Sequence, residues 1–137
     1  MPIAGHILFC KDFVFRDKST GKKLVIALNT CDNTETCLIL KTTSQKGHYY
    51  YSHSGCNSLK KCFCIYAECK QGGFDEEYTF VQLDHIYPIN VDELLNAKQI
   101  SFIDRISDIC FTNLKRCLRN YKDDIPIQFW SLIYKST

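Results

Sequence analysis

The sequence lacks the features that mark membrane, secreted and disordered proteins. Charged residues interrupt every hydrophobic run, so no stretch approaches the roughly 18 apolar residues of a membrane span. Residues 1–10 hold no basic stretch followed by an apolar core, which argues against a secretory signal. Prolines number only three and 45% of the residues are hydrophobic, which excludes a disordered chain. We therefore expect a single domain over residues 1–137, located in the cytoplasm and without membrane contact.

Several catalytic signatures are missing as well. The only closely spaced glycines, Gly72 and Gly73, fit a hairpin turn better than a phosphate-binding loop. The chain contains no Gly-x-Ser-x-Gly elbow and no His-Glu-x-x-His pair. The enzyme classes that these motifs mark are disfavoured, and we expect no cofactor.

Cysteine is abundant, with nine residues, an odd number that internal disulfides cannot fully pair. Because no secretory signal is present, we expect the cysteines to be reduced. Four of them lie within fourteen residues: Cys56, Cys62, Cys64 and Cys69. Their spacing matches no zinc knuckle or ribbon, so no metal site is predicted and packing is the preferred interpretation.

The positions of four cysteines predict a place in the core. Cys62 and Cys64 alternate with Phe63 and Ile65, so they share one face of a predicted strand. Cys110 and Cys117 lie one heptad apart on a predicted apolar helix stripe.

Most of the first ninety residues read as short strands. β-branched and aromatic runs occur at residues 6–10, 13–15, 23–29, 36–43, 62–67, 78–83 and 85–87. Turn signals separate them at residues 17–21, 32–34, 54–58 and 71–75. This pattern predicts a small antiparallel barrel, or a strongly bent sheet, over about residues 5–90.

The rest of the chain changes to a helical period. Apolar residues recur at three- and four-residue steps over 101–118, where Ser101 and Asp104 resemble a capping box. Shorter helices are predicted at 91–97 and 126–134. The sequence thus predicts an α+β fold in which a helical extension, about 91–135, follows the barrel.

Charge is divided unevenly along the chain. Residues 1–73 carry ten Lys and Arg against five Asp and Glu, whereas residues 74–137 carry seven against ten. Three of the four histidines lie in the basic part. A surface that meets phosphates has this composition, and so does a solvated lysine face.

The most informative segment runs from Leu40 to His53. It gathers lysines, hydroxyls, histidines and tyrosines: Lys41, Thr42, Thr43, Ser44, Lys46, His48, Tyr49, Tyr50, Tyr51 and His53. Lysines can hold phosphate oxygens, hydroxyls can donate to them, and tyrosine rings can stack on unpaired bases. A polar strand end with a solvated hairpin is the alternative.

The order of several short motifs resembles the MazF/PemK family of toxin endoribonucleases. Gly5-His-Ile-Leu-Phe9 is similar to that family's opening Gly-Asp-Ile-Val strand. Gly21-Lys-Lys-Leu-Val-Ile-Ala-Leu28 resembles the basic loop that leads into an Arg-Pro-x-Leu-Val-Leu strand. Leu40-Lys-Thr-Thr-Ser-Gln-Lys-Gly47 is similar to the family's Thr-x-Gln stretch, and Val81-Gln-Leu-Asp-His-Ile-Tyr-Pro-Ile89 to its late Leu-Asp-Gln-Val-Arg strands. The resemblance covers about residues 5–97.

The resemblance implies roles for particular residues. Lys23, where the family has arginine, is implied to stabilise the scissile phosphate. Thr43 is implied to be the threonine that helps the 2′-hydroxyl attack, or Thr42 or Ser44 if the register differs by one. His48 or His53 is the implied proton-transfer residue. RNA contacts are implied for residues of the same two basic segments: Arg16, Lys22, Lys41, Ser44, Lys46 and His53.

The resemblance also implies a fold and a function. The fold is a compact SH3-like barrel, usually a homodimer. The function is metal-independent cleavage of single-stranded RNA, restrained in the cell by an antitoxin protein. The alternative is a non-catalytic small barrel that binds nucleic acid or a protein partner.

Overall fold

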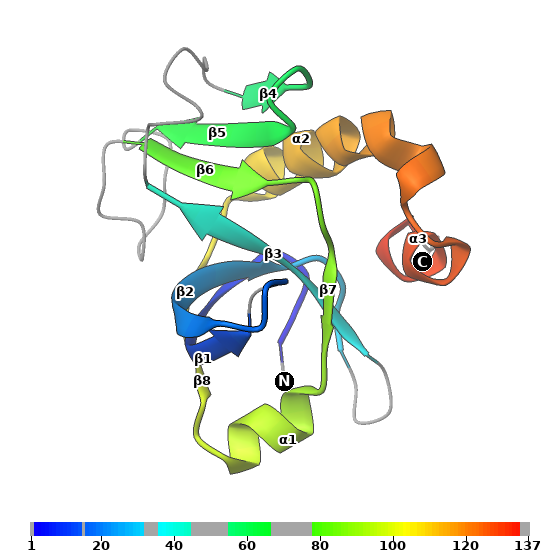
Figure 1. The fold of residues 1–137 in the computed structure, drawn as a ribbon. Helices are drawn as coiled ribbons and strands as arrows, with labels where there is room; N and C mark the ends of the chain where they lie inside the picture. Colours follow the sequence, from blue (N-terminus) through cyan, green and yellow to red (C-terminus); the bar gives the residue numbers. More distant parts are fainter. Residues whose placement is uncertain (1, 15, 32–35, 45–54, 67–77, 135–137) are drawn as a thin grey trace.

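Among the described residues, eight antiparallel strands form one sheet (Figure 1). The first helix comes after the seventh strand, and the other helices come after the eighth. The computed structural model describes residues 2–14, 16–31, 36–44, 55–66 and 78–134. The strands are β1 (His6–Val14), β2 (Thr20–Ala27), β3 (Cys37–Thr43), β4 (Gly55–Asn57), β5 (Cys62–Tyr66), β6 (Tyr78–Gln82), β7 (Tyr87–Ile89) and β8 (Ile100–Arg105). The helices are α1 (Val91–Asn96), α2 (Asp108–Leu118), the 3-10 helix η2 (Arg119–Asp124) and α3 (Ile127–Tyr134).

The strand order is β4-β5-β6-β3-β2-β1-β8, and β7 pairs with β3 beyond the end of β6. Strand β3 therefore has β2 along one edge, and β7 and β6 in succession along the other. The predicted α+β class with antiparallel strands is confirmed. Among the described strands the pairings form an open path from β4 to β8, so they do not close a barrel.

The sheet separates two apolar cores, because side chains alternate between its faces. One face of β3 carries Leu38 and Leu40, which pack in a cluster with residues of α2 and α3. The other face carries Cys37 and Ile39, which pack in a second cluster with residues of β7 and α1. Figure 1 shows α2 and α1 at opposite ends of the molecule. Helices α2 and α3 therefore pack on one face of β3, and helix α1 packs on the other.

The predicted long helix at 101–118 is wrong in its first third. Residues 100–105 form strand β8, which pairs with β1, and helix α2 begins only at Asp108. The helix cap is Ser107, whose hydroxyl accepts a hydrogen bond from the Cys110 backbone N–H at 3.1 Å. Pairing with β1 satisfies the backbone hydrogen bonds of β8. The local periodicity of the sequence cannot reveal such a distant partner. The shorter predicted helices correspond to α1 and α3 and are confirmed.

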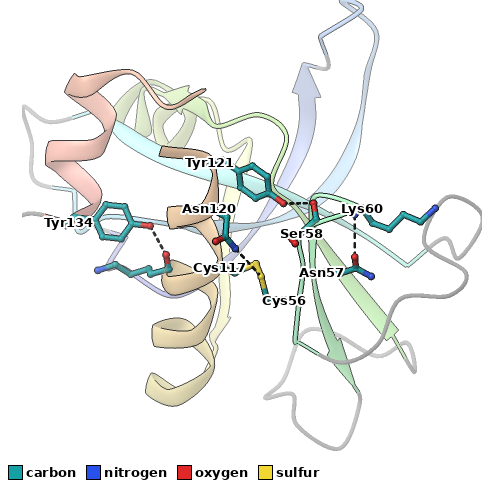
Figure 2. The surroundings of a disulfide bond; sticks show 9 residues. Cys56, Asn57, Ser58, Lys60, Cys117, Asn120, Tyr121 and Tyr134 are labelled. Carbon is teal, nitrogen blue, oxygen red and sulfur yellow. Dashed lines mark hydrogen bonds between the residues drawn. A yellow bond between two sulfur atoms is a disulfide. The ribbon is translucent and has the colours of Figure 1, made fainter. Parts of the chain in front are cut away.

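The expectation that all cysteines are reduced is also wrong. Cys56 on β4 and Cys117 on α2 form a disulfide, 61 residues apart in sequence (Figure 2). The predicted core position of Cys117 is confirmed, since it is buried among the residues packed under α2. Cys62 and Cys64 are buried against Phe80, which confirms their packing role.

Polar contacts reinforce the link between the β4–β5 hairpin and the helices. The Asn120 amide donates to Cys56 Sγ at 3.6 Å, and the Tyr121 hydroxyl donates to the Ser58 carbonyl at 2.9 Å (Figure 2). The β4–β5 hairpin is therefore held to the C-terminal helices by three side chains that follow one another closely in the chain.

Helix α3 packs on α2 and η2 through aromatic and cationic side chains. The Tyr134 hydroxyl donates to the Lys115 carbonyl at 2.6 Å, and the Arg119 guanidinium lies 4.4 Å from the centre of the Tyr134 ring. Burial raises the pKa of Tyr134 to about 12, so this phenol remains a hydrogen-bond donor at any physiological pH.

Two further sequence expectations concern metals and membranes. In the described ranges, no three His, Cys, Asp or Glu side chains are grouped as metal ligands would be, and Cys69 lies outside those ranges. Of the helices in the same ranges, none combines the length and apolar character that crossing a bilayer requires.

Breaking the disulfide should destabilise the fold measurably. Closing a loop of this length restricts the unfolded chain, so Cys56→Ser should lower the free energy of unfolding by about 2–4 kcal/mol. Denaturant unfolding with and without reductant measures the effect. Cys110→Ser, outside the disulfide, is the control and should still respond to reductant as the parent does. A parent whose unfolding midpoint ignores reductant would contradict the prediction.

Candidate functional site

The polar site begins where two apolar strands become basic on the same face. Val25 pairs with Lys41 and Ala27 with Ile39, so these side chains share the face that carries the second core. By alternation Lys23 continues this face of β2, and Thr43 continues it on β3. Continuing the antiparallel register places Lys23 across from Thr43. The β2–β3 pairs end at Val25 and Lys41, and beyond them the Lys23 ammonium reaches the Thr42 carbonyl, next to Thr43 in the chain.

The lysine ammonium groups share one electrostatic environment. Lys23 is half-buried, and its Nζ donates to the Thr42 carbonyl at 3.2 Å. Burial lowers the pKa of Lys23, and the neighbouring positive charge of Lys41 lowers it further. Two ammonium groups that raise each other's energy create a positive potential, which an anion between them would relieve.

The structure also distinguishes between the three hydroxyl candidates. Thr42 is buried on the opposite face, where its hydroxyl donates to the Leu24 carbonyl at 2.8 Å. Ser44 is exposed and lies one residue beyond the end of β3. Of these three residues, Thr43 is the one that shares a face with Lys23 and Lys41.

A histidine that was not predicted as a site residue lies beside Lys41. His85 packs edge-on against Tyr87, with ring centres 4.4 Å apart, and Lys41 Nζ lies 6.0 Å from the same Tyr87 ring centre. Burial lowers the pKa of His85, and the positive charge of Arg16 lowers it further, while Asp84 opposes this shift. This shift favours the neutral imidazole, which has a nitrogen that can accept a proton.

Arg16 completes the positive side of the cluster. Its guanidinium lies 4.0 Å from the Asp84 carboxylate, and both side chains are substantially exposed. Nearby, hydrogen bonds from Ser19 lower the pKa of Asp17, and Lys41 contributes a smaller effect in the same direction. We call Arg16, Lys23, Lys41, Thr43 and His85 the cationic cluster.

Of the remaining predicted residues, the structure describes Lys22, which lies apart from this cluster. Lys22 neighbours Lys23 in β2, so alternation places it on the opposite face. His48, Lys46 and His53 lie outside the described residues.

The sequence does contain a weak signal for His85 and for the Tyr87 ring that it contacts, neither of which was predicted as a site residue. His85 and Tyr87 are two positions apart, immediately after a strand, as residues on one face of an extended segment would be. What the sequence does not contain is the partner strand, because β7 pairs with the start of β3 and not with its own neighbour in the chain.

The cluster has the groups required for chemistry at a phosphodiester. It offers cations for the phosphate, a hydroxyl donor and a neutral imidazole that can accept a proton. Comparison with protein-family models, with curated proteins and with solved structures finds no match for this chain. Its functional interpretation therefore rests on this geometry and on the motif resemblance.

Proposed function

We propose that this protein is a metal-independent endoribonuclease that cleaves single-stranded RNA and acts as the toxin of a toxin–antitoxin pair. The observation that carries the proposal is the cationic cluster, in which Lys23, Lys41 and Thr43 share a sheet face beside the neutral His85. The strand pairing holds these residues rigidly, as a preorganised site requires.

The reaction is an internal transesterification. The RNA 2′-oxygen attacks the adjacent phosphorus, the bond from phosphorus to the 5′-oxygen breaks, and a 2′,3′-cyclic phosphate and a 5′-hydroxyl are formed. His85 takes the proton of the 2′-hydroxyl, while Lys23 and Lys41 stabilise the charge that develops on the phosphoryl oxygens. Thr43 donates a hydrogen bond to the same group. The departing 5′-oxygen takes up a proton, for which His48 or His53 remains the candidate from the sequence.

The finer fold and the cellular setting belong to the same proposal. An antiparallel sheet in which β3 serves two cores supports an SH3-like barrel of the MazF/PemK type, which the described pairings leave open between β4 and β8. RNA as substrate supports a cytoplasmic location and an antitoxin segment that covers the cationic cluster. A neighbouring reading frame that encodes a small acidic protein would support the antitoxin, and its absence would count against it.

One observation favours the alternative of a non-catalytic binding module. The Lys23 ammonium already donates to a backbone carbonyl and, unlike arginine, cannot grip a phosphate with two parallel hydrogen bonds. Salt-sensitive RNA binding without turnover would identify this case.

Removing the Lys23 cation or the Thr43 hydroxyl should strongly slow cleavage without loss of the fold. We expect Lys23→Ala and Thr43→Ala each to lower the cleavage rate by about 10²–10³-fold, because each removes a group that stabilises the transition state. Lys23→Arg should retain activity because it keeps the charge. Gel analysis of a single-stranded RNA, with chemical detection of the 2′,3′-cyclic phosphate, measures both rate and product.

Lys22→Ala is the matched control, since it removes the same charge from the opposite face of the same strand. We expect it to cleave at close to the parent rate. If the parent leaves RNA uncut, or if Lys23→Ala and Thr43→Ala behave like the parent, the endoribonuclease proposal is wrong.

The pH dependence should report the environment of His85. The imidazole acts in its neutral form, so kcat/KM should fall as the pH drops through its pKa, below the ordinary value of 6.5. Arg16→Gln removes a neighbouring positive charge and should move this midpoint to higher pH. Asp84→Asn removes a negative charge and should move it lower. Midpoints that coincide in all three proteins would show that His85 is not the titrating base.

The proposed enzyme is a homodimer joined through β8. Among the described strands β8 pairs with β1 only, so its outer edge is open, and Phe102 and Ile103 there are 58% and 40% exposed. Antiparallel pairing of two β8 strands would place each Phe102 beside the partner strand and reduce its exposure. Sedimentation should show a dimer for the parent and for Ile109→Asp, which changes an exposed residue on α2, and a monomer for Phe102→Asp. A monomeric parent would refute this interface.

A further inference from the structure

A hollow of about 250 Å³ opens beside the cationic cluster, between β1, β7, α1 and the start of β8. Pockets for drug-sized ligands occupy roughly 300–1,000 Å³, so this one suits a smaller group. Its wall includes Phe13 and Tyr87, whose rings meet edge-on with their centres 4.8 Å apart.

The hollow combines an aromatic wall with polar side chains at its rim. Asp12 and Glu93 are exposed there, from β1 and α1, together with the amide side chain of Gln99. In the described part of the chain, neither carboxylate has a cationic partner. The wall offers a surface for a flat ring, and the rim offers hydrogen-bond acceptors to the edge of that ring.

Tyr87 connects the hollow with the cationic cluster. The residue lines the hollow, and its ring also contacts His85 and lies near Lys41. Its hydroxyl is buried and has no hydrogen-bond partner among the described residues, which is a costly state for a polar group. The Tyr87 ring is therefore the group that the hollow and the cationic cluster share.

We propose that this hollow is a base-binding subsite that selects a nucleobase with an exocyclic amino group. The inference rests on the proposed action on RNA and specifies it further. A base and its phosphate are joined through one sugar, so a strand with a phosphate at Lys41 brings a neighbouring base to Tyr87. Asp12 and Glu93 accept hydrogen bonds from the amino group, as carboxylates do from cytosine N4.

The charges at the rim favour a base over other occupants. Carboxylates repel a phosphate, so the backbone of the RNA is kept at the lysines, outside the hollow. An apolar peptide side chain would offer no hydrogen-bond donor to the Asp12 and Glu93 carboxylates. A flat group with donors on its edge satisfies both the wall and the rim.

Free nucleosides test the subsite without any cleavage. Cytidine and uridine differ at one ring position, an amino group in the first and a carbonyl in the second. Titration of each into ¹⁵N-labelled protein should show cytidine binding about tenfold more tightly, with shifts centred on Phe13, Tyr87 and Leu94. Equal affinities, no binding of either, or shifts elsewhere would overturn the proposal.

Isosteric variants then test the two carboxylates. Asp12→Asn and Glu93→Gln exchange an acceptor for a group that can donate to the uracil carbonyl, so each should reduce or reverse the preference for cytidine. Asp92→Asn, an exposed neighbour on α1 that does not line the hollow, should keep it. An unchanged preference in both rim variants would refute the assignment.

Cleavage assays separate this inference from the proposed function. RNA substrates with cytosine or uracil at one position should be cut at different rates by the parent and at more similar rates by Asp12→Asn. Cleavage that depends on Lys23 but is indifferent to this base would leave the function standing and defeat the subsite. Selective binding of cytidine by a protein that cuts no RNA would support the subsite and refute the proposed endoribonuclease function.

Discussion

The pairing of β2 with β3 is the interaction on which the rest of the structure depends. Strand β3 has neighbours along both edges and contributes side chains to both apolar cores, so its register fixes which residues are buried and which reach the site. A shift of one residue would exchange Thr42 with Thr43. It would move the buried hydroxyl to the cationic cluster and the reactive candidate into the core. The burial of Leu38 and Leu40 on one face and Ile39 on the other opposes such a shift, so packing energy maintains the geometry of the site.

Much of this arrangement could be predicted from local patterns, because alternation is a property of the strand itself. The strands around residues 23–29 and 36–43 were predicted with bounds close to those of β2 and β3, and the joint placement of Lys23 and Thr43 agrees with them. The helix predicted at 101–118 was wrong because residues 102, 103 and 106 fit a helical stripe as well as a strand. These residues form a strand because they pair with the edge of β1, about ninety residues away in the chain. A local sequence window does not contain that partner.

Long-range contacts account for the other differences as well. An odd number of cysteines says nothing about which thiols meet. Cys56 and Cys117 meet because β4 lies beside α2, and Asn120 and Tyr121 contact the same hairpin. His85 was missed as a site residue for the same reason. The chain turns after β6, so β7 continues along β3 and the segment between them ends beside Lys41.

Division of charge along the chain into a basic and an acidic part is too coarse to describe the site. Asp12 lies in the basic part of the chain and Glu93 in the acidic part, yet both line the hollow that shares Tyr87 with the cationic cluster, and Asp84 of the acidic part lies 4.0 Å from Arg16. Opposite charges so close together serve different purposes when the ligand is a nucleotide. Cations hold the backbone regardless of sequence, whereas carboxylates placed beyond the reach of the phosphate read the donors of a base. Under the proposed function, the acidic residues add selectivity to a site in which Lys23, Lys41 and Arg16 supply the affinity.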